Sequence, residues 1–431
     1  MSFFEELFPI LGSAQFLLFW DIIKNWIWIP ISFLLFQVTL NLYLYFVRER
    51  WKAKIKWVML EIKIPREILK PIKAMESVFA SMWAVYDPPN PREKWLEGKI
   101  LLPFSLEIAS IEGEPHFFIF VAERFQKLVE SAIYSQYPDV QISIVDNYTK
   151  YVPADIPNKD WNLWGTDYIL SKDDSYPIKT YPFFESGTEV IEEKRIDPVS
   201  SILEGMARLG KGEQLWVQIT ATPVTNLEVG WVTKGEMIRD KLAKRPLKAA
   251  QKPLIQEAAE ILVFGPQAPP TQEKEMFPPE MRLTPGEKDI ITGVENKIGK
   301  YGFSTNIRFI YLAKGDVFFT PHVRFAMGFF TSFSTQNLNT LRPWPRTITK
   351  VHTIFAWFLD ARRLYIRKRR IFRNYIRRFP PLYPRKGGTF VLNTEELASL
   401  YHFPGKIVAP APTLPRIEAK KREAPPTLPI E

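Results

Sequence analysis

With 431 residues, of which 46% are hydrophobic and 14% aromatic, the chain is long enough for two or three folded domains, and wholesale disorder is excluded. The 57 lysines and arginines outnumber the 47 acidic residues, and the net charge of +10 favours an anionic partner such as lipid headgroups or nucleic acid. Because the chain has no cysteine, disulfides, thiol nucleophiles and thiolate metal sites are excluded.

A membrane-spanning helix is predicted from Trp26 to Val47. This stretch carries no charge, and about 20 such residues are enough to cross the hydrocarbon core of a bilayer. Tryptophans lie at its start and tyrosines near its end, as in the aromatic belts of membrane helices. The basic residues that follow it are Arg48, Arg50, Lys52, Lys54 and Lys56. By the positive-inside rule we expect a single-pass protein of the cell membrane with its C-terminal part in the cytoplasm.

The apolar run does not fit a signal peptide, because it is too long and its basic cluster follows it. The earlier stretch from Phe8 to Trp20 is apolar but short, so we expect an interfacial helix there. A second span over residues 8–20 is the alternative that the sequence leaves open. We assign residues 1–57 to a membrane anchor with an interfacial helix and a basic collar.

A first soluble domain is predicted over residues 58–150. Its expected elements are a strand at Val58–Ile64, a helix at Ile68–Val85, a hairpin of Phe104–Ile111 and His116–Val121, a helix from Phe125 to the break at Pro138, and a strand at Val140–Val145. The order β-α-β-β-α-β is that of a ferredoxin-like domain.

A second, interrupted α+β domain is predicted over residues 151–341. Its expected elements are a strand at Tyr168–Ser171, a helix at Ser200–Leu209, a strand at Leu215–Thr222, an exposed insertion at about 223–285, a helix at Gly286–Lys300, a strand at Ser304–Leu312 and a helix at Phe318–Phe333. The repeated strand-helix-strand opening indicates a duplication, so the predicted fold class is α+β with two ferredoxin-like domains after the membrane helix.

A basic helix is predicted within residues 342–389, where Asp360 is the only acidic residue between Arg342 and Arg378. The apolar residues expected to hold it to the domain are Leu364, Phe372, Tyr375, Ile376 and Phe379. The cations expected to meet nucleic acid, anionic lipid or solvent are Arg362, Arg363, Arg367, Lys368, Arg369, Arg370, Arg373, Arg377 and Arg378. A solvated face of a packing helix explains the same pattern equally well.

Residues 390–431 are predicted to form a short helix at Thr394–Tyr401 and an extended Pro-rich tail. Asn393 or Thr394 is the expected N-cap, and Glu395 and Glu396 favour the positive end of the helix dipole.

No catalytic, cofactor or metal motif is recognisable in the sequence. No two of the histidines are three or four residues apart, so a local zinc motif is absent. The Gly205–Lys211 segment has the glycine and lysine spacing of a phosphate loop, but Gly212 occupies the position of the magnesium-binding hydroxyl. We therefore expect a protein that is not an enzyme.

The segments FVLNTEELASLYHFPGKIV, APTLPRIEAKKREAPPTLP and LVESAIYSQYPDVQISIVDNYT resemble the membrane-anchored N-terminal region of coupling-protein-like ATPases of type IV secretion and conjugation systems. The resemblance covers most of the chain from about Val58 onward. In that family the tail motif precedes a nucleotide-binding motor domain that moves DNA, whereas this sequence stops at Glu431. The resemblance therefore carries over no ATPase activity and no cofactor.

The function expected from the resemblance is that of a non-catalytic membrane-anchored scaffold or adaptor that docks a separate P-loop motor ATPase. The residues expected to dock the motor are Glu395, Glu396, Leu397, Leu400, Tyr401, His402 and Phe403. The alternative is a membrane-tethered nucleic-acid-binding protein that acts through its basic helix. The sequence leaves open whether the basic helix meets DNA or lipid, and whether the chain forms a homo-oligomer.

Overall fold

The computed structural model describes residues 24, 26–65, 70–185, 197–243, 283–351, 357–380, 387–405 and 416–417. It divides into two compact units. The anchor unit lies within residues 1–56 and 87–101, and the sheet unit lies within residues 57–86 and 102–431. The predicted Phe8–Trp20 helix and most of the Pro-rich tail lie outside the described residues.

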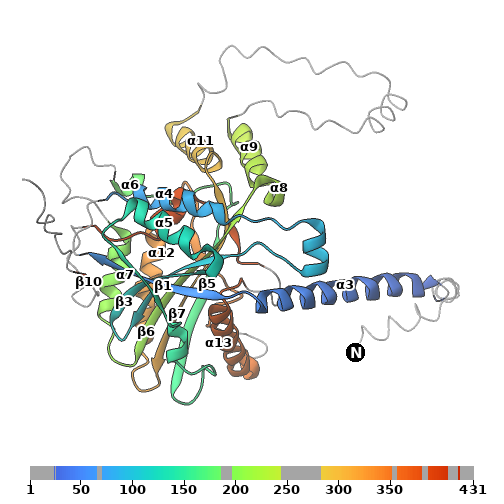
Figure 1. Cartoon of the computed structure of the whole chain (residues 1–431), viewed down its shortest axis with the longest axis horizontal. Helices are drawn as coiled ribbons and strands as arrows, with labels where there is room; N and C mark the ends of the chain where they lie inside the picture. The colour runs from blue at the N-terminus through green and yellow to red at the C-terminus, as the bar shows by residue number, and fades with distance from the viewer. Residues whose placement is uncertain are drawn as a thin grey trace, which may run out of the picture. The chain divides into compact units, whose positions relative to one another are not determined.

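Within the described residues, the anchor unit contains one long apolar helix, α3 (Trp28–Ala53, blue in Figure 1). It is long and apolar enough to span a membrane, and none of its most apolar window is buried. The span predicted from Trp26 to Val47 thus continues into the basic residues without a break. In the same unit, a short π-helix (η2, Glu93–Glu97) ends at Gly98, whose φ of +74° and close approach to the Val47 backbone leave no room for a Cβ.

The sheet unit is built around a ten-stranded sheet in the described residues. Its strands are β1 (Trp57–Pro65), β2 (Phe104–Ile111), β3 (Glu114–Ala122), β4 (Gln141–Val145), β5 (Trp161–Leu170), β6 (Glu213–Val224), β7 (Gly302–Lys314), β8 (Leu341–Pro343), β9 (Phe390–Asn393) and β10 (Arg416–Ile417). All pairings are antiparallel except that of β10 with β1.

The helices of this unit connect and cover the strands. They are α4 (Lys73–Met82), α5 (Gln126–Gln136), α6 (Pro182–Glu185), α7 (Pro198–Ala207), α8 (Asn226–Val229), α9 (Trp231–Leu242), α11 (Pro285–Ile298), α12 (Val323–Ser332), α13 (Asp360–Arg377) and α14 (Thr394–Leu400). The 3-10 turns are η1 (Trp83–Val85), η3 (Glu123–Phe125), η4 (Tyr148–Tyr151), η7 (Thr320–His322) and η8 (Trp357–Leu359).

The first four strands pair in the order β4-β1-β3-β2, with α4 following β1 and α5 following β3. The helix α4 buries Met75, Val78, Phe79 and Met82, whose spacing forms one apolar face. The β2–β3 hairpin closes through Glu112 and Gly113, and both residues have a positive φ. A two-residue turn whose twist matches that of its strands requires this conformation.

The next four strands repeat this pairing in the order β8-β5-β7-β6, with α7 following β5 and α12 following β7. The helices α8, α9 and α11 lie between β6 and β7 in the sequence, in and beside the predicted insertion. The two groups of strands join edge to edge, because β2 pairs with β6 from Phe104 opposite Ala221 to Ile111 opposite Gln214.

The two faces of the sheet carry different layers. One face packs against α4, α5, α7, α12 and α14 in the larger hydrophobic core, and Figure 1 shows α4, α5 and α12 on that side. On the other face, Ile371, Phe372 and Tyr375 of α13 pack against residues of β2, β6 and β7. Both faces are therefore covered, which explains why the residues of the central strands are buried over nearly their whole length.

The structure confirms the α+β class and most predicted elements of the sheet unit, and it corrects several bounds. The strand predicted at Tyr168–Ser171 begins at Trp161, and the helix predicted at Ile68–Val85 is shorter and ends in a 3-10 turn. The insertion contains the helix α9, which the sequence did not predict. Short strands β8 and β9 were also missed. The division into two soluble domains stays a prediction.

Candidate functional site

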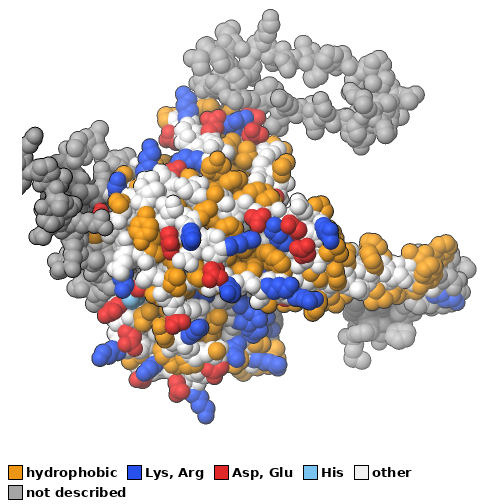
Figure 2. Space-filling view, viewed as in Figure 1, with side chains coloured by type: hydrophobic (Ala, Val, Ile, Leu, Met, Phe, Trp, Pro, Cys, Tyr) orange, Lys and Arg blue, Asp and Glu red, His pale blue; other side chains and the backbone are white. Residues whose placement is uncertain are grey.

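The basic helix α13 has one buried face and one open face. Phe372 and Tyr375 are buried as expected, together with Ile371, whereas Leu364, Ile376 and Phe379 are only partly buried. The cations Arg362, Arg373 and Arg377 are exposed. Figure 2 shows Lys and Arg side chains gathered over the place of α13. The predicted basic surface therefore exists, but not all of its predicted members belong to it.

Arg378 lies inside the protein and is not part of the basic surface. Its guanidinium binds the fully buried Glu107 of β2 in a fork, with Nε–Oε1 at 2.7 Å and Nη2–Oε2 at 3.1 Å. It also lies 4.0 Å from the ring centre of Phe120. The prediction that Arg378 contacts an anionic ligand is wrong, because its charge is already neutralised by a buried carboxylate.

Glu107 is the centre of a buried hydrogen-bond network. Besides Arg378, it accepts hydrogen bonds from the Tyr148 hydroxyl at 2.7 Å and from Gln218 at 2.9 Å. Burial works against ionisation, but the charge and hydrogen bonds of Arg378 hold the pKa of Glu107 below its usual value. The network fastens the end of α13 to the sheet, since Tyr148 also shares a 2.7 Å hydrogen bond with Tyr375.

A second buried ion pair lies on the neighbouring strands. Arg308 of β7 donates from Nε to Asp167 of β5 at 3.0 Å, and both side chains are fully buried. The guanidinium also donates to Asn306 and to the Phe379 carbonyl, the latter at 2.8 Å. Sequence reasoning missed these groups, although a charged residue in the middle of an apolar strand, such as Glu107 or Arg308, was a usable signal.

Several other cations of α13 have partners within the protein. Arg367 donates to the carbonyls of Pro345, Ile348 and Lys350, and Lys368 donates to Asn162 Oδ1 at 2.6 Å. Burial lowers the pKa of Lys368. Arg363 lies 3.6 Å from Asp360. Arg369 and Arg370 are only partly exposed, so the most accessible cations of α13 are Arg362, Arg373 and Arg377.

The predicted docking segment lies in the core. The side chains of Glu396, Leu397, Leu400, Tyr401, His402 and Phe403 are all buried, and Glu395 is partly buried. Asn393 and Glu396 form a capping box at the start of α14, which confirms the predicted capping role. Docking by this segment stays an untested prediction, but the structure leaves these side chains almost no surface to offer to a partner.

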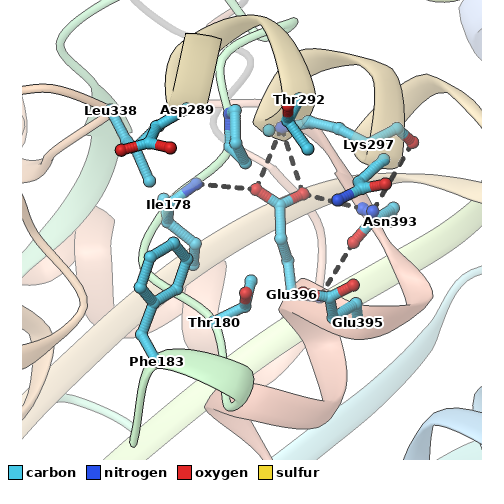
Figure 3. A pocket seen from close by; sticks show the side chains of 13 residues that line it. Ile178, Thr180, Phe183, Asp289, Thr292, Lys297, Leu338, Asn393, Glu395 and Glu396 are labelled. Atoms are coloured by element: carbon cyan, nitrogen blue, oxygen red, sulfur yellow. Dashed lines mark hydrogen bonds and ion pairs between the residues drawn. The ribbon is translucent and has the colours of Figure 1, made fainter. Parts of the chain in front are cut away.

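A cavity of about 260 Å³ lies beside α14. Figure 3 shows α11 on one side and α14 on the other, with Ile178, Thr180 and Phe183 completing the wall. Its other lining residues are Pro177, Asp289, Thr292, Gly293, Asn296, Lys297, Leu338, Asn393, Glu395 and Glu396. The cavity has an apolar wall and a polar wall, and on the polar wall Lys297, Asn393 and Glu396 bind one another.

Glu396 and Lys297 form a buried ion pair at this cavity, with Nζ 3.0 Å from Oε2. The carboxylate also accepts hydrogen bonds from the backbone N–H groups of Ile178 and Asn393, each at 2.9 Å. Burial raises the pKa of Glu396, although Lys297 opposes that shift. With its oxygens saturated by internal donors, Glu396 serves as a structural cap and is poorly placed to transfer a proton to a ligand.

Three histidines pair with carboxylates. The pairs are His116 with Glu61 at 2.7 Å, His322 with Glu213 at 2.7 Å and His402 with Asp197 at 3.0 Å. They lie apart from one another, and the described residues contain no group of three or more side chains that could hold a metal ion. His352 lies outside the described residues.

The fold and these contacts define an α+β protein in which one long sheet buries two ion pairs beneath a basic helix. The chain belongs to the family described as a domain of unknown function (DUF8128), whose model matches residues 89–410. A comparison with curated proteins found no match.

Proposed function

We propose that this protein is a single-pass scaffold of the cell membrane, without catalytic activity, whose sheet unit lies in the cytoplasm. The observation that carries this proposal is α3, in which an apolar window without buried residues runs directly into Arg48, Arg50 and Lys52. An exposed apolar surface of this length is costly in water, and the basic end favours the cytoplasmic side of a bilayer.

The sheet unit is proposed to consist of two ferredoxin-like repeats. Support comes from the order β4-β1-β3-β2 and its repetition as β8-β5-β7-β6, each with two crossing helices. Such a scaffold offers large surfaces to a partner, and it needs no reactive centre. The proposed partner is a separate P-loop motor ATPase of a type IV secretion or conjugation-like apparatus, and this partner rests on the sequence resemblance alone.

Membrane insertion and orientation are tested by cysteine labelling, because the chain has no native cysteine. Leu227 of α8 is 98% exposed, so Leu227→Cys places a single thiol on the surface of the sheet unit. The full chain should stay in the membrane pellet after alkaline carbonate extraction, and a membrane-impermeant maleimide should label the introduced thiol only after the cells are permeabilised. Labelling of intact cells would contradict the cytoplasmic orientation, and carbonate extraction of the chain would contradict the anchor.

The partner is tested by co-purification from detergent-solubilised membranes followed by mass spectrometry. A deletion that begins at Thr394 would remove core side chains such as Leu397 and Tyr401 and would disturb the fold. The truncated variant therefore ends after Gly405, which keeps these side chains. Recovery of a P-loop ATPase with the full chain supports the adaptor role. If no ATPase is recovered with a folded, membrane-embedded chain, this role is contradicted.

The second candidate function is nucleic-acid binding by α13. The observation that favours it is the exposure of Arg362, Arg373 and Arg377. Replacing all three with Glu should weaken DNA binding and reduce the slope of log affinity against log salt by about one for each phosphate that is no longer bound. Arg324→Glu, an exposed change on α12, is the matched control. The absence of DNA binding by the unaltered chain at low salt would exclude this function.

A further inference from the structure

The start of α13 carries an unusual concentration of exposed hydrophobic side chains. Trp357 and Phe358 are 74% and 67% exposed, although large aromatic side chains are normally mostly buried. The other large hydrophobic side chains exposed on this segment are Leu359, Tyr365 and Ile366. We call these five residues the α13 patch. It lies in η8 and the first two turns of α13, before the face formed by Ile371, Phe372 and Tyr375 meets the sheet.

Cations are interleaved with this patch. Arg362, Ile366, Arg369 and Arg373 follow one another at spacings of four, three and four residues, which places them along one face of the helix. This face lies away from the buried Ile371 and Tyr375. An exposed helix surface thus combines aromatic rings, aliphatic side chains and guanidinium groups, with Asp360 as its only acidic residue.

This composition is that of a helix that lies in a membrane interface. Tryptophan and tyrosine prefer the headgroup level of a bilayer, aliphatic side chains gain free energy in the acyl region just below it, and arginines bind anionic headgroups. Nucleic acid fits the arginines and the aromatic rings, but Leu359 and Ile366 have no flat face on which a base can stack. Lipid is therefore the occupant that uses every member of the patch.

We propose that the α13 patch inserts into the surface of an anionic lipid bilayer and gives the sheet unit a second, reversible membrane contact. This inference rests on the proposed membrane anchoring, because the anchor is what brings the patch near a bilayer. Only Lys54, Ile55 and Lys56 separate α3 from β1. So short a connection keeps the sheet unit close to the bilayer, and a tethered contact needs little intrinsic affinity because its effective concentration is high.

The test uses Ala361→Cys, because Ala361 is exposed on α13 one turn before Tyr365 and the chain has no other thiol. The full-length variant is labelled with a polarity-sensitive fluorophore and reconstituted in nanodiscs of neutral phosphatidylcholine, with or without phosphatidylserine. The emission should shift to the blue in the anionic discs and should be quenched by lipids brominated near the headgroup. The matched control is the label at Leu227→Cys, which should respond to neither change, because α8 contains no Lys or Arg.

Two further variants separate the contribution of the aromatic side chains from that of the arginines. Trp357→Ser combined with Phe358→Ser should abolish bromolipid quenching at position 361, whereas Arg362→Glu combined with Arg373→Glu should abolish the difference between anionic and neutral discs. All four side chains are exposed, so these changes leave the core intact. Arg324→Glu on α12 should leave both signals unchanged.

An unshifted label at position 361 in anionic discs would overturn the inference. A shift produced by single-stranded DNA and not by anionic lipid would also overturn it, and would assign the surface to nucleic acid. Insertion of the chain is read separately from its co-elution with the nanodiscs. If the chain does not insert but its label still shifts with anionic vesicles, the α13 patch is supported and the proposed anchor fails.

Discussion

Arg378 adopts a backbone conformation that is unfavourable for an arginine, and its side-chain contacts stabilise the fold. It occupies the position after α13 with a φ of +54°, a conformation in which glycine is usual. An arginine accepts this strain here because its guanidinium reaches the buried carboxylate of Glu107 and the ring of Phe120. The identity of the side chain is thus set by a partner on β2 and not by the turn.

Replacing Arg378 with Ala should destabilise the protein strongly. The change leaves Glu107 buried without its cation, a loss on the order of 3–5 kcal/mol in the free energy of unfolding. Arg378→Lys keeps the charge but cannot bind with a fork, so its loss should be intermediate. Urea unfolding in detergent, followed by tryptophan fluorescence, measures both. The exposed neighbour Arg377→Ala should stay within about 0.5 kcal/mol of the unaltered chain, and equal losses at the two positions would refute the structural role.

The pairing of Glu61 with His116 predicts sensitivity to acid. The hydrogen bond from His116 is the largest cause that lowers the pKa of Glu61 from its usual 4.5, with a smaller contribution from Lys63. Because the pKa is lower in the folded state, this stabilisation is fully present above pH 4.5 and is lost as the pH falls through the folded value. His116→Ala should therefore flatten the fall in stability below pH 4.5, as measured by urea midpoints at several pH values. Lys63→Ala should flatten it less, and a larger effect of Lys63 would contradict this assignment.

At the scale of elements, α14 depends on its cap. Asn393 accepts a hydrogen bond from the backbone N–H of Glu396 at 2.8 Å, and the Glu396 carboxylate accepts one from the N–H of Asn393. Asn393→Ala should lower the free energy of unfolding by about 0.5–2 kcal/mol. Thr389→Ala, an exposed change just before β9, serves as the control. Should the two variants unfold at the same urea concentration, the capping box would not stabilise α14 measurably.

An element is predictable from the sequence when the residues that determine it are close together in the chain. Strands such as β1 and β6 were predictable because a run of apolar residues is local. The strands β8 and β9 were missed because three or four residues carry no periodic signal, and they exist only through pairing with β5 and β7. Arg378 was misassigned to the basic surface because its partner, too, is not local in the sequence. Its partner lies on β2, far away in the sequence, and helical spacing carries no information about such a contact.

At the scale of the whole sheet unit, the two groups of strands share their interior. The β2–β6 pairing makes one continuous sheet, and the larger core contains residues from Leu60 to Phe403. Residues far apart in the sequence also pack together, since Tyr401 and Phe403 make edge-to-face contacts with Phe117 of β3. Residues of the predicted domain 58–150 and of the remainder therefore contribute to one core.

The fragment 57–150 should therefore not fold by itself, although its strand order is complete. Isolated, it would expose the edge of β2 and the face of Phe117 that Tyr401 covers, and an exposed apolar edge favours aggregation over a cooperative fold. Mixing it with the fragment 151–405, which supplies β6 and α14, should restore a fixed tertiary structure, measured by near-ultraviolet circular dichroism and a single unfolding transition. A fragment 57–150 that unfolds cooperatively at the midpoint of the full chain would show that the first four strands are an independent domain. The shared core predicts the opposite, because the residues that complete the first half are contributed by β6 and α14 of the second.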